Sequence, residues 1–279
     1  MSETGTGILA AELRWVRRPA LDVAELLPRI AALAGTPVEH VPNEAGNAVD
    51  QFRFPALRTE LGEGSIEMQV IVARPDADPS GPLPPGAFLH SWDWPEAATL
   101  LAGATDALLV TDLMASGVTP RPRLRAWHAV LRAIVEAAPP AGIHLRTSDR
   151  VVSSGSYLAG LEEEPTGFSV LLNLRRFHVD EATGEAVFDT LGLAPFGLPD
   201  IQLHFRDLDH EAAARWTRIL AWYVYANGDV IEDGHAVSGV DAGEQWPCRH
   251  EIGMADPERV VLDVDPSPHG PDRETITGG

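Results

Sequence analysis

The sequence predicts an α+β protein with a mixed, largely antiparallel sheet or sheets and helices packed on one face. Three observations support this fold class. Four segments place apolar residues at helical spacing, short apolar or alternating runs lie between them, and residues 180–184 form a turn that joins two such runs directly. A mixed order of helices and hairpins is typical of α+β folds, and two ferredoxin-like half-domains fit this order.

Each of the four expected helices has a recognisable start or stop. Asp22 opens the first as an N-cap, although Pro28 inside the segment predicts a later start. Prolines in a first turn open the second and third helices, near residues 93–96 and 119–120. The fourth runs from Asp209 to Asn227 and stops at a glycine. We expect its buried stripe to contain Ala212, Trp216, Ile219, Leu220 and Tyr223.

The expected strands lie between and after these helices. They cover residues 8–16, 66–73, 107–112, 143–152, 168–179, 186–193, 201–205 and 229–232. The second half of the chain therefore has the order β-β-β-α-β. Its hairpin at residues 180–184 predicts antiparallel pairing between the strands on either side.

We place a domain boundary between Ser153 and Thr166, where a glycine, three glutamates and a proline interrupt the apolar pattern. The predicted domains are an N-terminal α+β half, residues 1–153, and a C-terminal α+β half, residues 167–264. Residues 265–279 have no apolar periodicity and are predicted to be a disordered tail. Residues 76–86 form a Pro/Gly-rich loop.

Charge and composition exclude several classes of protein. The chain of 279 residues carries 41 acidic and 21 basic side chains, a net charge of −20, so we expect no nucleic-acid partner and no membrane surface as partner. One cysteine forms no intramolecular disulfide, and neither a signal peptide nor a spanning apolar stretch is recognisable. We therefore expect a cytoplasmic protein whose acidity either aids solubility or attracts a basic partner.

The stretch from Phe188 to Glu251 is dense in carboxylates and imidazoles, the groups that bind divalent metals or transfer protons. The candidate catalytic residues are Asp200, His204, Asp229, Glu232, Asp233 and His235. The candidate metal ligands among them are His204, Asp233 and His235. A structural interpretation competes, because Asp200 and His204 share one face of an ordinary strand and the acidic residues after Gly228 suit a turn. No zinc, phosphate-loop or dinucleotide motif is present, so we expect no cofactor.

Two further features each have two interpretations. Cys248 beside Arg249 and His250 is either a thiol with a lowered pKa or an inert packing residue. Trp92 and Trp94 either line a ligand pocket or anchor the core at a helix start.

Short motifs in the last third of the chain resemble the bacterial domain-of-unknown-function family 4261. They lie at Asp189–Asp209, Gly228–His235, Trp246–Glu251 and Pro257–Asp263, and WPEA at Trp94–Ala97 resembles the N-terminal half of the same family. The resemblance implies a cytosolic bacterial protein. It implies no activity, catalytic residue or cofactor.

The leading hypothesis is a non-catalytic binding or protein-interaction module, because catalytic motifs are missing and the chain is acidic. Whether the protein is an enzyme stays open. A metal-assisted hydrolase built on the block 200–235 is one alternative, and it requires those side chains to converge on one metal position. An acidic immunity-type inhibitor is another, and it requires acidic residues on one face.

Overall fold

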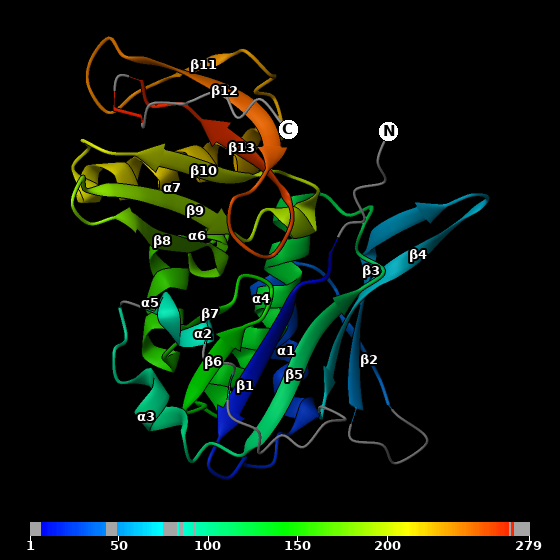
Figure 1. Ribbon diagram of the computed structural model, residues 1–279. Coiled ribbons are helices and arrows are strands. Elements are labelled where there is room, and N and C mark those ends of the chain that lie inside the picture. Colours follow the sequence, from blue (N-terminus) through cyan, green and yellow to red (C-terminus); the bar gives the residue numbers. More distant parts are fainter. Residues whose placement is uncertain are drawn as a thin grey trace. The chain divides into compact units, whose positions relative to one another are not determined.

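The computed structural model divides into two compact units, Met1–Leu171 and Leu172–Gly279 (Figure 1). It describes residues 7–42, 49–74, 83, 86–91, 93–267 and 269–270. Each unit combines helices with a largely antiparallel sheet, which confirms the α+β fold class. The ferredoxin-like arrangement and the predicted domain limits stay predictions. Most of the predicted loop at 76–86 and most of the predicted tail lie outside the described residues.

The first unit contains a seven-stranded sheet in the order β2-β3-β4-β5-β1-β6-β7, and all of its neighbouring pairs are antiparallel. Its strands are β1 (Ala10–Trp15), β2 (Glu39–Val41), β3 (Val49–Leu61), β4 (Gly64–Ala73), β5 (Asp106–Leu113), β6 (Gly142–Leu145) and β7 (Arg150–Val152). Its helices are α1 (Val23–Ala34), α2 (Gly86–Leu89), α3 (Ala97–Leu101), α4 (Pro120–Ala137), α5 (Ser154–Glu163) and α6 (Phe168–Leu171).

Helix α4 is the main cover of this sheet. It contacts β3, β4 and β5, and α1 packs against it. Trp127 and Leu131 of α4 are fully buried, so the helix fixes the core of the unit. A buried ion pair also ties α4 to β5, because Arg123 Nε lies 2.6 Å from Asp112 Oδ2.

Local differences from the predicted elements in the first unit have physical reasons. Helix α1 begins directly after Asp22, whose side chain accepts a hydrogen bond from Ala24 N, and Pro28 lies inside the helix, so the expected later start is wrong. Strand β3 was not predicted, since Pro55 interrupts its pattern where the pairing with β4 becomes irregular. The strand expected at 143–152 is two strands, β6 and β7, separated by a turn with Asp149 at φ 50°.

The segment that was expected to form a break carries helix α5. Ser153 caps this helix, because its side chain accepts a hydrogen bond from Ser156 N at 3.0 Å. The short helix α6 follows, so the strand expected from residue 168 begins instead at Asn173.

The second unit contains a six-stranded sheet in the order β11-β12-β13-β10-β9-β8, with β13 between β12 and β10 (Figure 1). The pair β10–β13 is parallel and the other pairs are antiparallel. Its elements are β8 (Asn173–Asp180), β9 (Glu185–Leu191), the 3-10 helix η1 (Ala194–Phe196), β10 (Asp200–Phe205), α7 (His210–Asn227), β11 (Ala236–Ser238), β12 (Gln245–Ile252) and β13 (Val260–Val264).

Helix α7 packs on β9 and β10 and sets the geometry of the site below. Asp209 caps it by accepting a hydrogen bond from Ala212 N, and it ends at Gly228. The strand expected at residues 229–232 is instead an irregular segment that leads into a turn at Asp233 and Gly234, and Gly228 and Gly234 have positive φ. We call this segment the turn after α7. None of the described helices has the length and apolar composition needed to cross a membrane.

Candidate functional site

The six candidate catalytic residues lie in separate groups. Asp200 is fully buried on β10, where it accepts hydrogen bonds from Thr190 Oγ1 and Leu193 N, and Arg259 Nε lies 3.3 Å from its other oxygen. Burial raises the pKa of Asp200 to about 6, against the opposing effect of Arg259. This carboxylate belongs to the interior of the sheet.

His204 and His235 belong to two other groups. The imidazole Nε2 of His204 lies 2.8 Å from Glu185 Oε1, and Arg206 donates to the other oxygen of the same carboxylate. His235 Nε2 lies 3.7 Å from Glu232 Oε2 on the turn after α7, and both side chains are exposed. The two histidines that the sequence singles out therefore have different partners.

Asp229 and Asp233 are the pair that the structure does bring together, around a histidine of β12. His250 Nδ1 lies 2.8 Å from Asp233 Oδ1, and His250 Nε2 lies 3.0 Å from Asp229 Oδ1. The carboxylates face opposite sides of one imidazole ring, which is not how two ligands approach a common metal ion.

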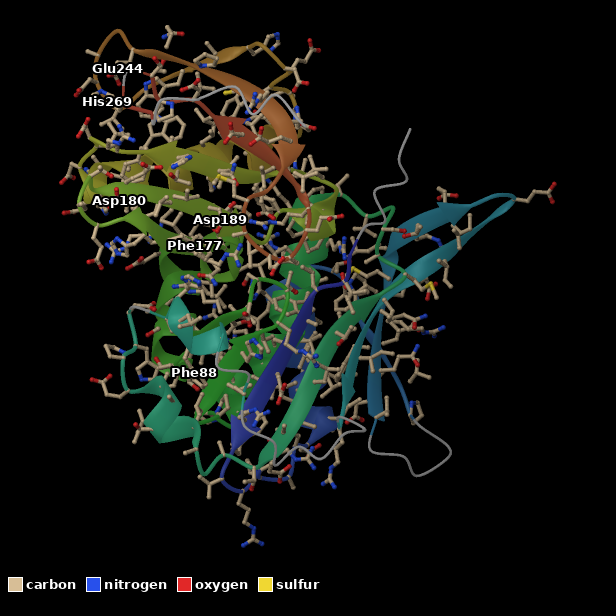
Figure 2. All side chains as sticks on the ribbon, in the orientation of Figure 1. Phe88, Phe177, Asp180, Asp189, Glu244 and His269 are labelled. Carbon is tan, nitrogen blue, oxygen red and sulfur yellow. The ribbon has the colours of Figure 1, made fainter. Side chains whose placement is uncertain are left out.

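The candidate metal ligands His204, Asp233 and His235 thus have separate partners in the structure. Within the described part of the chain, the group of side chains close enough to share an ion is instead Asp241, Glu244 and His269. Both oxygens of the Glu244 carboxylate are already engaged, because Oε1 pairs with His269 at 2.8 Å (Figure 2) and Oε2 accepts from the backbone N–H of Asp241. This geometry does not favour the metal-assisted hydrolase.

A buried ionic network explains another part of the polar block. Asp189 (Figure 2) is fully buried on β9 and accepts two hydrogen bonds from Arg175, at 2.8 and 2.6 Å. Arg259 donates to the same carboxylate at 2.5 Å and also to the carbonyls of Ala255 and Pro257. The network fastens the loop before β13 to the sheet, which is a structural role.

Two of the remaining sequence candidates, Cys248 and Trp94, are packing residues. Cys248 is buried on β12, and burial raises the pKa of its thiol to about 11, so the lowered pKa considered from its basic neighbours is wrong. Trp94 packs against the apolar cluster that α2 and α3 form with Val151. Trp92 lies outside the described residues.

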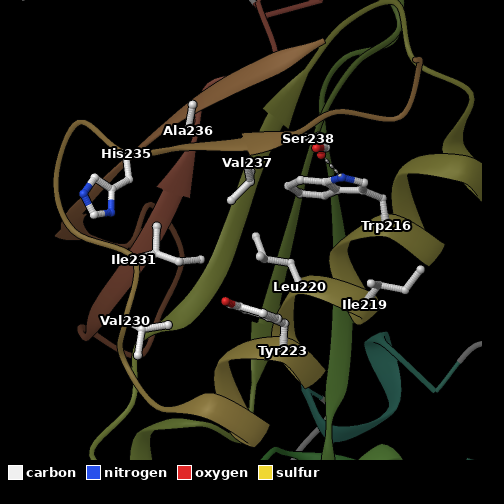
Figure 3. A pocket seen from close by; sticks show the side chains of 10 residues that line it. All are labelled: Trp216, Ile219, Leu220, Tyr223, Val230, Ile231, His235, Ala236, Val237 and Ser238. Atoms are coloured by element: carbon white, nitrogen blue, oxygen red, sulfur yellow. Dashed lines mark hydrogen bonds between the residues drawn. The ribbon is translucent and has the colours of Figure 1, made fainter. Parts of the chain in front are cut away.

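A groove between α7 and β11 is the concave feature that the sequence did not identify (Figure 3). It has a volume of about 680 Å³, within the range of small-molecule sites. Helix α7 forms one wall, the turn after α7 another, and β11 the third. The lining residues are Trp216, Ile219, Leu220, Tyr223, Val230, Ile231, His235, Ala236, Val237 and Ser238.

The groove exists because α7 has apolar residues on two faces. Leu220 belongs to the buried face, but Ile219 is 62% exposed and Tyr223 is 44% exposed, so the prediction that these two side chains are buried is wrong. Ala212 and Trp216, the other two residues predicted to be buried, are only half-buried. Trp216 leans over the end of the groove and donates from Nε1 to the carbonyl of Ser238 at 2.9 Å (Figure 3). The sequence did contain a signal for the groove, because the apolar stripe of α7 is wider than the face that one contact with a sheet can bury.

Comparison with known proteins places this groove in a family segment. Residues 189–265 match the family model of a domain of unknown function, DUF4261. The resemblance predicted from the sequence is confirmed over that segment. No curated protein and no solved structure matches the chain. The DUF4261 segment runs from the middle of β9 through β13 and contains α7, all three walls of the groove, and Asp189 and Arg259 of the buried network, whose third member Arg175 lies before it. No activity comes with the match.

Proposed function

We propose that this protein is a non-catalytic binding module that captures an apolar segment of a partner protein in the groove beside α7. The observation that carries the proposal is the exposure of Ile219, Tyr223 and Val230, which are 62%, 44% and 49% exposed around one concavity. Clustered apolar side chains in a groove are typical of an interaction site, whereas scattered ones are not.

The size of the expected effect follows from these side chains. Fully burying a large aliphatic or aromatic side chain contributes about 1.5–3 kcal/mol, so covering three half-exposed ones contributes on the order of 3 kcal/mol. That is roughly a hundredfold in affinity. A partner segment therefore gains most of its specific binding from a few anchors, as is usual at protein interfaces.

The charge beside the groove favours a partner with basic residues next to its apolar anchors. Glu232, on the turn wall, keeps its side chain 82% exposed, and the chain as a whole carries a net charge of −20. Opposite charges at the edge of an interface speed association and select partners. The partner that we propose is therefore a protein, and neither a nucleic acid nor a membrane.

The test is site-specific photocrosslinking in cells of the source organism. A photoreactive phenylalanine analogue at Tyr223 should yield a defined crosslinked product, which Val230→Asp in the same chain abolishes. The matched control carries the analogue at Ile252, which is 58% exposed outside the groove, and should not yield that product. The same product from both positions, or from neither, would count against the groove as the binding site.

A further inference from the structure

The turn that forms one wall of the groove is fastened to the sheet by His250 of β12. Asp229 and Asp233 stand at the two ends of this turn, and each places a carboxylate oxygen on one ring nitrogen of His250, at 3.0 and 2.8 Å. Val230 and Ile231 lie between these two anchors along the chain, and both line the groove (Figure 3). The backbone N–H of His250 also donates to Asp233 Oδ1, at 2.7 Å.

The arrangement requires a particular protonation state of the ring. An ionised carboxylate only accepts hydrogen bonds, and a neutral imidazole has one N–H to donate. Both ring nitrogens of His250 donate together only when the ring is an imidazolium. A neutral ring keeps one of the two bonds and turns a lone pair towards the other carboxylate. Asp233 also accepts a hydrogen bond from the backbone N–H of His250, whereas Asp229 contacts His250 only through the ring. The Asp229 end of the turn is therefore held less firmly than the Asp233 end.

The surroundings of His250 agree with a charged ring. Partial burial acts to lower its pKa, but the hydrogen bonds and charges of Asp233 and Asp229 outweigh burial and raise the pKa above its ordinary value. Along β12, Cys248 is neutral, and Arg249 pairs with Glu251 at 2.7 Å and lies 3.7 Å from Asp263.

The other neighbours add no strong charge to the ring. On β13, the residue opposite His250 in the sheet is Leu262, which is apolar. The turn's other titratable groups, Glu232 and His235, lie 3.7 Å from each other.

We propose that His250 is a proton-operated latch for this wall of the groove. The imidazolium holds the turn from Asp229 to Asp233 on β12, and loss of one ring proton releases the Asp229 end together with Val230. The effect on binding rests on the proposed function, whereas the latch itself does not. A group whose folded pKa is raised contributes stability that is fully present below its unfolded pKa and is lost as pH rises through the folded pKa. The latch is therefore closed in mildly acidic solution and opens as pH rises.

The latch is tested on the full chain without any ligand, in buffer containing EDTA. The ring Cε1–H signal of His250 is titrated by NMR, and amide exchange of Val230, whose N–H donates to the carbonyl of Gly228 in the segment that is released, is followed over the same pH range. The midpoint for His250 should lie above 6.5, and the exchange protection of Val230, after correction for its intrinsic rate, should fall through that midpoint. A midpoint at or below 6.5, or a protection that does not change there, overturns the latch.

Two variants separate the latch from general damage to the turn. Asp229→Asn removes one charge while keeping an acceptor, so it should move the His250 midpoint to lower pH. His235→Gln is the matched control, because His235 is an exposed histidine of the same turn and should leave the midpoint unchanged. An unchanged midpoint in Asp229→Asn would also overturn the latch.

Binding of Nile red, a neutral apolar dye, distinguishes failure of the latch from failure of the groove. The affinity of the protein for the dye should fall as pH rises. The fall should be up to ~tenfold for each unit by which the pKa of His250 in the closed latch exceeds its pKa in the released state. In His250→Gln the affinity should be low and independent of pH. Absence of dye binding at every pH, with a normal His250 titration, contradicts the groove as a binding site and supports the latch. Equal dye binding at every pH contradicts the latch and supports the groove.

Discussion

Replacing Asp200 by asparagine should make the protein respond differently to pH, because Asp200 is a carboxylate buried at a cost. The substitution keeps the size of the side chain and an oxygen for Thr190 Oγ1 and Leu193 N, and it removes the negative charge. Two effects oppose each other at this position. Burial favours the neutral acid, and Arg259 at 3.3 Å favours the carboxylate.

The direction and size of the effect follow from the pKa. Burial dominates and raises the pKa of Asp200 from 3.8 to about 6. A shift of about two units corresponds to about 3 kcal/mol between the folded and unfolded states. Because the folded pKa is raised, the stability that Asp200 contributes is complete below 3.8 and is lost as pH rises through about 6. Asparagine does not titrate, so the variant does not suffer this loss.

Urea unfolding at a series of pH values, followed by tryptophan fluorescence, measures the difference. The free energy of unfolding of Asp200→Asn minus that of the unsubstituted protein should rise by about 3 kcal/mol from acidic to neutral pH, whatever its starting value. Asp207→Asn, at an exposed position after β10, should give a difference that hardly varies with pH. A difference that falls as pH rises would mean that Arg259 outweighs burial, and the reasoning would be wrong.

Two further predictions concern other buried groups. Arg123→Met leaves Asp112 buried without its ion partner and should lower the free energy of unfolding, measured by chemical denaturation, by about 3–5 kcal/mol. Arg29→Ala loses a more exposed ion pair with Glu136 and should lower the free energy of unfolding by less than about 1 kcal/mol in the same assay. Cys248 should resist iodoacetamide at neutral pH in the folded protein and react after urea is added, as measured by intact mass, because its thiol is buried and its pKa is raised to about 11. Rapid labelling without urea would contradict the second prediction.

The parts of the fold that could be predicted are those whose limits are set by neighbouring residues. Helix α7 was located because Asp209 caps its start and Gly228 ends it, and β9 and β10 were located from their apolar runs. Strand β3 was missed because Pro55 interrupts a pattern that only its pairing with β4 sustains. The turn after α7 was mistaken for a strand because Val230 and Ile231 are apolar.

The sequence could predict which polar residues belong to the candidate site, but not which of them contact one another. The polar block does contain interacting groups, but the partner that joins Asp229 to Asp233 is His250. His250 lies on β12, and local patterns revealed neither β12 nor β11 before it. The groove depends on how far the apolar stripe of α7 extends past its contact with the sheet. Periodicity assigns a residue such as Ile219 to an apolar face and does not say what covers that face.

The place of β13 has a consequence for the order in which the second unit is made. This strand is the last of the unit along the chain, yet it lies between β12 and β10, pairing antiparallel with one and parallel with the other. During synthesis, β8, β9 and β10 can assemble with α7 while β11 and β12 form a separate hairpin. The two parts of the sheet join only after Val260–Val264 has been made, so the unit completes its sheet late and all at once.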